Sequence, residues 1–160
     1  MADKVVNVVF AGLGGQGVLK AADILAEAAF QSGLDVKKAE VHGMSQRGGF
    51  VMSDVRYGRT VLSPMVPPAE ADFLVLLEES QLVASQPRLR PGGVVLSVSA
   101  IDVDALPTKR ALNVAMVGML SAHLDFPEAV WKSALRANLP EAMMEANEKA
   151  FAMGRTTQRG

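Results

Sequence analysis

The amino-acid sequence predicts an α/β protein with a Rossmann-like three-layer fold, a mainly parallel sheet and a helical C-terminal portion. The first sign is a continuous apolar run, Val5–Ala11, of the kind that forms a parallel strand buried on both faces. A glycine-rich turn and an alanine-rich helical pattern follow it directly, and a second strand-like segment ends at Val41. Strand, helix and strand in this order form a right-handed βαβ unit. Beyond Ile101 the pattern becomes helical.

Each further element has its own sequence signature. Gly17–Gln31 repeats apolar residues at a helical period, and Ser32-Gly33 ends it. Alternation over Phe50–Arg56 predicts a strand with one wetter face, whereas the prolines of Ser63–Ala69 predict a loop. Glu78-Glu79 is interpreted as a solvated helix start. The remaining expected elements are strands at 35–41, 73–77 and 93–98, a short helix at 78–86, a turn at 91–93, a connector ending at Pro107, and helices at 109–123, 126–138 and 140–153.

Length and composition are those of one domain. The chain has 160 residues, of which 49% are hydrophobic, which is ample for a single buried core. We therefore expect one domain over residues 1–160, with a frayed polar tail at 155–160. A formal net charge of −1 gives no electrostatic reason to expect nucleic acid or an anionic membrane as a partner.

The chain contains no cysteine, so it has no disulfide, thiolate nucleophile, zinc ribbon or iron–sulfur ligation of its own. Any redox chemistry must therefore be carried out with or by another group. The polar residues before Val5 do not form a secretory signal, and no apolar run approaches the length of about 18 residues that a membrane span needs. We expect a cytoplasmic protein.

The most informative segment is the glycine loop, residues 12–17, which lies between the first strand and the first helix. Without Cβ atoms the backbone turns sharply there, and a ligand can press against bare N–H groups at the positive end of the helix dipole. The sequence therefore predicts an anion site, most often one for phosphate, with a tight packing turn as the alternative. The candidate contacts are Gly12, Gly14, Gly15, Gln16 and Gly17.

The spacing of Gly12, Gly14 and Gly17 also satisfies the GxGxxG dinucleotide fingerprint. That fingerprint further requires an acidic residue about 20 positions on, at the end of the second strand. Glu40 is the candidate for this role. The pattern alone is weak, because the fingerprint requires neither Gly15 nor Gln16.

A second polar, glycine-rich loop leaves the end of the second strand. In a doubly wound sheet it would lie beside the glycine loop, at the carboxyl ends of neighbouring strands, where such sheets bind ligands. The candidate contacts are Ser45, Gln46, Arg47, Gly48 and Gly49. Arg47 could hold a phosphate or carboxylate through its guanidinium group, or instead form a surface ion pair or subunit contact. His42 has neither a cysteine nor an evident serine nucleophile to work with, so a structural role is favoured.

Five segments together resemble a known family: GLGGQGV, EVHGMSQRGGFVMSDVRYG, ADFLVLLE, PGGVVLSVS, and LNVAMVGML with the closing NEKAFAMG. They are similar to the gamma-type subunit of 2-oxoacid:ferredoxin oxidoreductases, and most closely to the beta subunit of indolepyruvate ferredoxin oxidoreductases. The resemblance extends from about Val5 to Gly154. The paired GxGGQG and HGxSQRGG loops are far more specific than GxGxxG alone.

The resemblance implies an accessory subunit that is inactive alone. A partner subunit would carry thiamine diphosphate and [4Fe–4S] clusters, decarboxylate a 2-oxo acid, pass electrons to ferredoxin and transfer the acyl group to coenzyme A. No Gly-Asp-Gly thiamine diphosphate signature occurs in this chain. Its own role would be to dock on that subunit and to help form the coenzyme A site. The glycine loop could equally hold another nucleotide or the partner's backbone, and Asn113 would brace the helix that follows it.

One departure from the family is the short connector Ser99–Arg110, where many members have a longer stretch, so we expect a helix or an edge strand of the family fold to be missing here. Two alternative functions follow from the residues. GxGxxG with Glu40 would suit a stand-alone NAD-binding dehydrogenase domain, although no second domain remains to bind a substrate. A nucleotide-sensing module would be favoured by a stable homodimer with no larger partner.

Overall fold

A computed structural model describes residues 4–42 and 49–157 of the chain, and for His42 the backbone alone. The centre of the described part is a five-stranded sheet with the order β2-β3-β1-β4-β5. The strands are β1 (Val6–Leu13), β2 (Asp35–His42), β3 (Phe50–Gly58), β4 (Ala71–Leu76) and β5 (Leu89–Ser97). The helices are α1 (Val18–Gln31), α2 (Leu82–Ser85), α3 (Leu112–Ser121), α4 (Glu128–Asn138) and α5 (Met144–Thr157).

The sheet is mainly parallel, as the sequence predicts. β1 pairs in parallel with β4, and β4 with β5, whereas β3 is antiparallel to both β1 and β2. All strands except β3 therefore run in one direction. The expectation that β2 is the neighbour of β1 is wrong, because β3 folds back between them. A short connection from β2 to β3 permits this arrangement, since antiparallel strands need no crossover helix.

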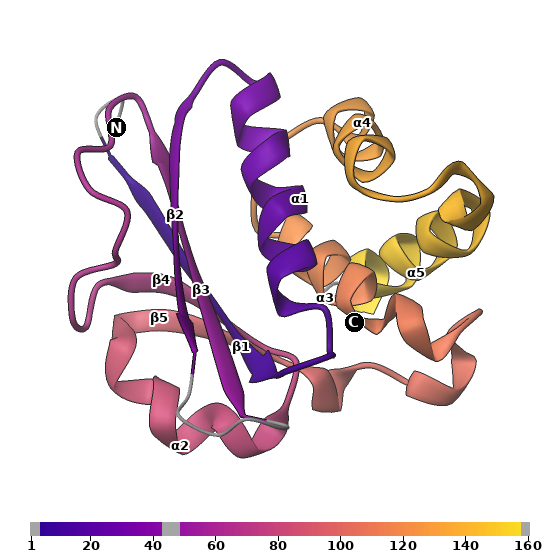
Figure 1. Cartoon of the computed structure of the whole chain (residues 1–160), viewed down its shortest axis with the longest axis horizontal. Coiled ribbons are helices and arrows are strands. Elements are labelled where there is room, and N and C mark those ends of the chain that lie inside the picture. Colours follow the sequence, from indigo (N-terminus) through magenta and orange to yellow (C-terminus); the bar gives the residue numbers. More distant parts are fainter. Residues whose placement is uncertain (1–3, 43–48, 158–160) are drawn as a thin grey trace.

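One face of the sheet carries nearly all the helical mass. Figure 1 shows α1, α3, α4 and α5 together on that side. The main core lies beneath them, and its largest fully buried side chains include Trp131, Phe10 and Ile24. α3 is the most deeply placed helix, since every residue from Asn113 to Ser121 is buried. A helix that is apolar all round belongs in the interior of the molecule, so α3 is the centre of the helical layer.

The opposite face has a thinner cover, made by the loop at residues 59–70 and by the short turns and α2 at residues 79–88. A smaller core of Met52, Leu74 and Leu76 with Val66 and Leu82 fills this side. The three-layer architecture thus consists of a helical layer, the sheet and a third layer of loop and short helix. The loop around Ser63–Ala69 is present as the proline content predicts.

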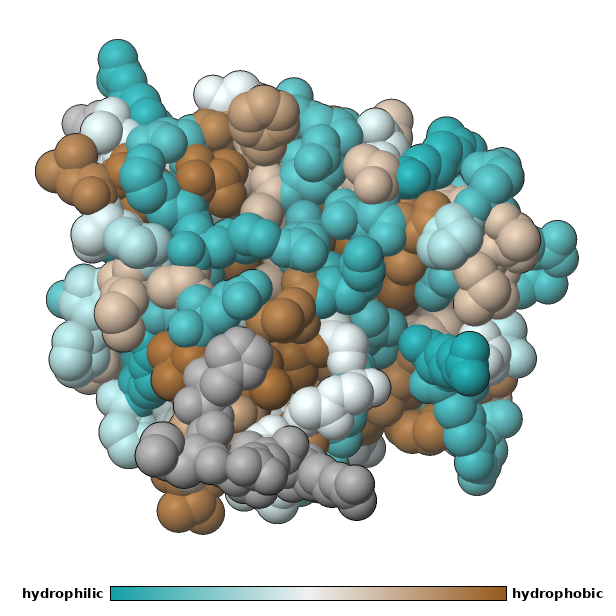
Figure 2. All heavy atoms as spheres, in the orientation of Figure 1, coloured by the Kyte–Doolittle hydropathy of each residue, from teal (hydrophilic) through white to brown (hydrophobic). Residues whose placement is uncertain are grey.

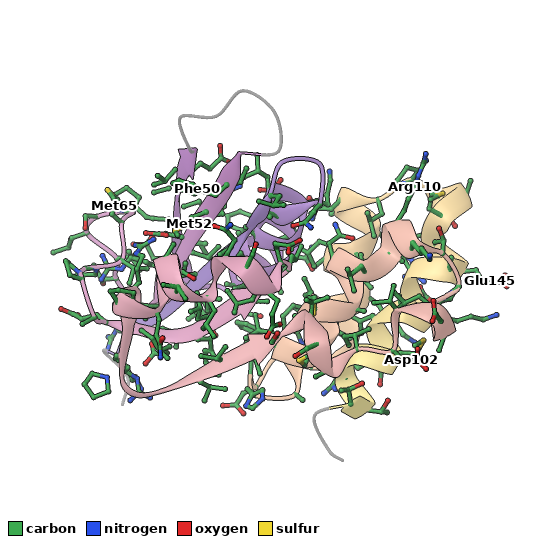
Figure 3. The ribbon with its side chains drawn as sticks, turned by 90° about the horizontal axis from the view of Figure 1, so that it is seen from below. Phe50, Met52, Met65, Asp102, Arg110 and Glu145 are labelled. Carbon is green, nitrogen blue, oxygen red and sulfur yellow. The ribbon has the colours of Figure 1, made fainter. Side chains whose placement is uncertain are left out.

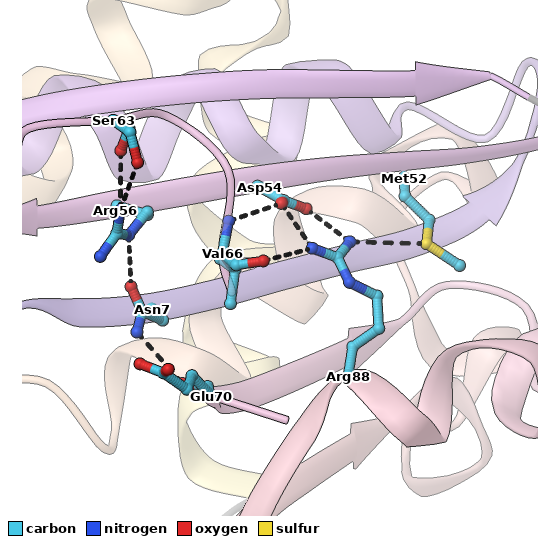
Figure 4. A network of polar contacts seen from close by, with 8 residues as sticks. All are labelled: Asn7, Met52, Asp54, Arg56, Ser63, Val66, Glu70 and Arg88. Carbon is cyan, nitrogen blue, oxygen red and sulfur yellow. Dashed lines mark hydrogen bonds and ion pairs between the residues drawn. The ribbon is translucent and has the colours of Figure 1, made fainter. Parts of the chain in front are cut away.

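Polar contacts, the central ones around the buried Asp54, hold that loop against the sheet (Figure 4). Asp54 on β3 is completely buried, and both of its carboxylate oxygens accept hydrogen bonds from Arg88, at 2.8 and 2.6 Å. The N–H of Val66 donates to the same carboxylate at 2.9 Å, and Arg56 donates to the carbonyl oxygen of Ser63. The predicted wetter face of β3 is therefore wrong, because an ion pair replaces water around its carboxylate.

Two boundaries differ from the sequence predictions. β5 begins at Leu89, so Pro91-Gly92-Gly93 lies inside the strand, where the pairing register shifts between Ala71 and Phe73. β5 is an edge strand, which tolerates a proline because one side of it needs no partner. At the other end of the chain, Arg155–Thr157 form the last turn of α5, where the sequence predicts the start of a frayed tail.

The surface is mixed in character. On the face shown in Figure 2, hydrophilic side chains are interspersed with smaller apolar areas, as is usual for protein surfaces. The exposed large apolar side chains are Phe30, Leu62, Met65, Val83 and Val95. Among the described helices, none combines the length and apolar character needed to cross a membrane.

Two glycines allow α3 and α5 to approach each other at backbone distance. A Cβ on Gly118 would lie 2.1 Å from the carbonyl oxygen of Phe151, and one on Gly154 would lie 1.8 Å from that of Ala115. No heavy atoms approach that closely without a shift of the backbone. The pairing of α3 with α5 therefore depends on the missing side chains at these two positions.

Replacing Gly154 by alanine should destabilise the protein, although the same change in an ordinary helix stabilises it by about 1 kcal/mol. The added methyl must separate the two helices, and overpacking of this kind costs about 1–3 kcal/mol or more. Urea unfolding measures the change. The control is Ala152→Gly at an exposed position of the same helix, which should cost about 1 kcal/mol. A Gly154→Ala protein as stable as the wild type would contradict the close packing.

Candidate functional site

The glycine loop joins the carboxyl end of β1 to α1, and its shape requires glycine at two positions in particular. A Cβ at Gly12 would lie 2.8 Å from both the Gln16 side-chain oxygen and a Val18 methyl. Gly17 has a φ of +83°, in the left-handed region, and a Cβ there would lie 2.4 Å from the amide nitrogen of Asn113. The backbone of the loop thus packs directly against the start of α1 and against Asn113 of α3, with no space for side chains at these two positions.

Gln16 braces the loop from within. Its side-chain oxygen accepts a hydrogen bond from the N–H of Leu13 at 2.7 Å, and its amide nitrogen donates to Glu78 Oε1 at 2.9 Å. This bridge links the end of β1 to the residues just after β4. The sequence predicts that Gln16 offers its N–H group to a ligand together with the loop glycines, and the structure adds that both polar atoms of its side chain form hydrogen bonds within the fold. Glu78, which the sequence interprets as a solvated helix start, is instead half-buried against this loop.

Several backbone N–H groups of the loop remain available to a ligand. Gly14 donates to Gly49 O at 3.0 Å and Gln16 to Leu13 O at 3.2 Å. The N–H groups of Gly15 and Gly17, by contrast, donate no hydrogen bond within the residues that the structure describes. α1 begins at Val18 with no side-chain cap and no acidic residue in its first turn. The first N–H groups of such a helix lack carbonyl partners and carry the positive end of its dipole.

These donors surround a hollow of about 350 Å³. Its lining consists of three loop glycines and their neighbours: Leu13, Gly14, Gly15, Gly17, Val18, Leu19, Lys20 and Val51. Lys20 is exposed and adds a full positive charge beside the uncapped helix end. The sequence analysis did not include Lys20 among the candidate contacts, although its position three residues after Gly17 places it in the first turn of α1. Donors, dipole and ammonium group together favour an anion.

The second polar loop starts at the same end of the sheet. β2 ends at His42, and β3 begins at Phe50, which pairs with Leu13 at the end of β1. Gly49 contacts the glycine loop directly through the hydrogen bond from Gly14. The two loops are therefore neighbours, as the sequence predicts. The other four proposed contacts, Ser45, Gln46, Arg47 and Gly48, lie outside the described residues, and so does the side chain of His42.

Two further predictions concern residues around the loop. Asn113 does brace its helix, because its Oδ1 accepts from the N–H of Val114 at 2.9 Å and its Nδ2 donates to the carbonyl oxygen of Gly17 at 3.2 Å. It also ties α3 to the start of α1, which the sequence did not reveal. Glu40 pairs with Ser53 of β3, so the inserted strand separates it from β1. That separation removes Glu40 from the place of a ribose-binding carboxylate.

Metal binding finds no support in the described residues, which contain no group of three or more His, Cys, Asp or Glu side chains able to hold an ion. The loop presents backbone N–H groups at the carboxyl edge of a mainly parallel sheet. The fold is therefore that of a Rossmann-like protein, and the glycine loop lies at the edge where such sheets bind nucleotides.

This chain belongs to the pyruvate ferredoxin/flavodoxin oxidoreductase family, whose model matches residues 7–109. The indolepyruvate oxidoreductase subunit IorB of Thermococcus kodakarensis is 30% identical, over 92% of this chain and 93% of that protein. The alignment spans 188 positions, more than the 160 residues of this chain, so the relative carries insertions. The family resemblance seen in the sequence is confirmed.

Two solved structures have the same fold. The gamma subunit of a keto/oxoacid ferredoxin oxidoreductase from Geobacter sulfurreducens matches with a TM-score of 0.80 at 22% identity, over 98% of this chain and 97% of its own. The 2-oxoglutarate:ferredoxin oxidoreductase of Magnetococcus marinus, solved with 2-oxoglutarate, coenzyme A and succinyl-CoA bound, matches with a TM-score of 0.83 at 19% identity. The match covers 98% of this chain and 31% of that one.

The bridge from Gln16 to Glu78 can be tested by exchanging the two residues. Gln16→Glu places two carboxylates in contact and should destabilise the protein by about 1–2 kcal/mol at neutral pH, because the donor is lost. Adding Glu78→Gln should restore stability, since the new amide can donate to the new carboxylate. Denaturant unfolding measures all three proteins.

The matched control for this exchange is Gln31→Glu, because Gln31 donates to Glu27 in the same way at an exposed position of α1. Its cost should be only about 0.2–0.5 kcal/mol. A double variant no more stable than Gln16→Glu would show that the bridge does not hold the loop.

Proposed function

We propose that this chain is the accessory subunit of a 2-oxoacid:ferredoxin oxidoreductase of the indolepyruvate or arylpyruvate type. The complex would decarboxylate a 2-oxo acid oxidatively, transfer the acyl group to coenzyme A and pass two electrons to ferredoxin. The partner subunit would supply thiamine diphosphate and [4Fe–4S] clusters, for which this chain has no cysteine ligands. The relatives support this assignment, because the IorB protein is named as a subunit of an indolepyruvate oxidoreductase.

The observation that carries the proposal for this chain is the uncapped start of α1 beside the N–H groups of Gly15 and Gly17, which donate no hydrogen bond to any residue that the structure describes. The arrangement suits a phosphate, and coenzyme A is a phosphate-bearing substrate of the proposed reaction. The Magnetococcus marinus enzyme, which has the same fold over this region, was solved with coenzyme A bound. In this proposal Gly12, Gly14, Gly15 and Gly17 shape the site and Lys20 adds charge. Ser45, Gln46, Arg47, Gly48 and Gly49 would contribute from the second loop.

A stand-alone NAD-binding domain is the weaker alternative. The dinucleotide fingerprint needs its acidic residue on the strand next to β1, whereas Glu40 lies on β2, beyond the inserted β3. A nucleotide-sensing homodimer has no observation in its favour among the described residues.

The first experiment is an anaerobic affinity purification of this chain from the extract of its own organism. We expect a larger thiamine diphosphate and iron–sulfur subunit to co-purify. The recovered complex should reduce a viologen dye only when both a 2-oxo acid and coenzyme A are present. Recovery of the chain alone, or as a homodimer without such activity, would overturn the proposal. Comparison of indolepyruvate, other arylpyruvates and aliphatic 2-oxo acids then defines the substrate class.

Lys20→Gln should weaken coenzyme A binding without unfolding the protein, because Lys20 is exposed. Loss of one charged contact to a phosphate should raise the KM for coenzyme A by about 3–10-fold and leave kcat within about two-fold. Steady-state viologen reduction by the complex measures both constants. Lys149→Gln, an exposed lysine of α5, is the control. Equal KM values for the two variants would place the phosphate elsewhere.

A further inference from the structure

A second hollow, of about 330 Å³, lies between the start of α3 and the start of α5. It adjoins the glycine loop through one residue: Asn113 lines this hollow, and its amide group donates to the carbonyl oxygen of Gly17, which lines the first one. Figure 3 shows Arg110 and Phe50 along the same edge of the molecule. Phe50 pairs with Leu13 at the end of β1, where the glycine loop begins.

Asn147 gives this hollow an unused hydrogen-bond acceptor. The residue is only 5% exposed, and its amide nitrogen donates to the carbonyl oxygen of Met143 at 2.9 Å. Its side-chain oxygen accepts no hydrogen bond from any residue that the structure describes. The oxygen is partly accessible, so water or a ligand N–H in the hollow can donate to it.

The other walls restrict the ligand further. Leu139, Pro140 and Met143 form an apolar side, which suits the face of a flat ring. Arg110 lies at the rim, is exposed, and forms no ion pair within the described part of the chain. Asn113 already uses both ends of its amide group, for Gly17 and Val114, so it acts as a wall and not as a ligand contact. The volume of the hollow, about 330 Å³, falls at the lower end of the range for small-molecule sites, about 300–1,000 Å³.

We infer that this hollow binds the nucleoside end of a ligand whose other phosphates lie on the glycine loop. A flat ring with an exocyclic amine fits Asn147 and the apolar side, and a phosphate on the ribose fits Arg110. An adenine nucleotide with separated phosphates has this chemistry, and coenzyme A is one. The inference rests on the proposed function, and it assigns to Asn147 and Arg110 a binding role that the glycine loop does not require.

The test uses the complex purified with this chain and three acyl acceptors: coenzyme A, dephospho-coenzyme A, which lacks the ribose phosphate, and 4′-phosphopantetheine, which lacks the nucleoside. Arg110→Gln should raise the KM for coenzyme A about ten-fold, as loss of a charged hydrogen bond does, and leave that for dephospho-coenzyme A unchanged. Lys109→Gln is the matched control, because Lys109 is the adjacent exposed basic residue and does not line the hollow.

Asn147→Leu should raise the KM for coenzyme A and the KM for dephospho-coenzyme A to a similar extent, by several-fold. The KM for 4′-phosphopantetheine should stay unchanged. The last substrate separates loss of binding from loss of folding, because a collapsed site would affect all three. Coenzyme A with hypoxanthine in place of adenine lacks the exocyclic amine, so the wild type should bind it as weakly as the Asn147→Leu protein does.

The results separate this inference from the proposed function. If Arg110→Gln behaves like Lys109→Gln and Asn147→Leu changes all three acceptors equally, the nucleoside binds elsewhere and the inference is overturned while the proposed function stands. If the complex shows no dependence on coenzyme A, or if no complex is recovered, both are overturned.

Discussion

The contact between Gly17 and Asn113 is the point on which the candidate site depends. Gly17 is the left-handed residue that turns the chain into α1, and the Asn113 amide fills the space where its side chain would be. The position of Asn113 is fixed in turn by the buried helix α3, which packs on α5 at backbone distance through Gly118 and Gly154. The shape of a loop near the N-terminus is therefore determined by the last helix of the described chain.

The loop is held on its other side by the sheet. Gln16 joins the end of β1 to Glu78 after β4, and Gly14 joins it to Gly49 before β3. Three contacts from three directions leave the loop little freedom, and none of them uses the N–H groups of Gly15 and Gly17. A preorganised set of donors binds an anion without the cost of ordering the loop. In the proposed site, the brace residues would thus serve binding without touching the ligand.

The sequence predicts the elements well and their neighbours less well. The apolar periods, the glycine loop and the prolines are local signals, and they locate β1, α1 and the C-terminal helices correctly. The insertion of β3 between β2 and β1 depends on which strands pair, which is a non-local choice. Asp54 illustrates the difficulty: in the sequence it indicates a wet face, and only the fold brings Arg88 to it, 34 positions away. The Pro91-Gly92-Gly93 segment fits a strand only because β5 is at the edge.

The same limit applies to the candidate site. Its glycines could be found from spacing alone, since the need for bare backbone is local. The inward role of Gln16 could not, because its partner Glu78 lies just after β4, 62 positions further along the chain. Lys20 and Asn147 each lie in a helix together with other polar residues. Nothing in the sequence distinguishes them from those residues as candidates for a binding role. Their importance arises from the hollows that the packing leaves beside them.

The inserted strand also determines the direction in which a nucleotide can extend from the glycine loop. In the usual dinucleotide fold the second strand lies beside the first and offers a carboxylate to the ribose. Here β3 occupies that place and moves Glu40 away by one further strand spacing of about 4.8 Å.

α1 packs over β2, β3 and β1, whereas α3 packs beside β5, on the other side of α1. The second hollow lies at the start of α3, so the free space and the unused acceptor of Asn147 are on the side opposite Glu40. A ligand anchored by its phosphate at α1, as proposed, would therefore run toward α3 and α5, and the C-terminal helices would then belong to the binding site as well as to the core.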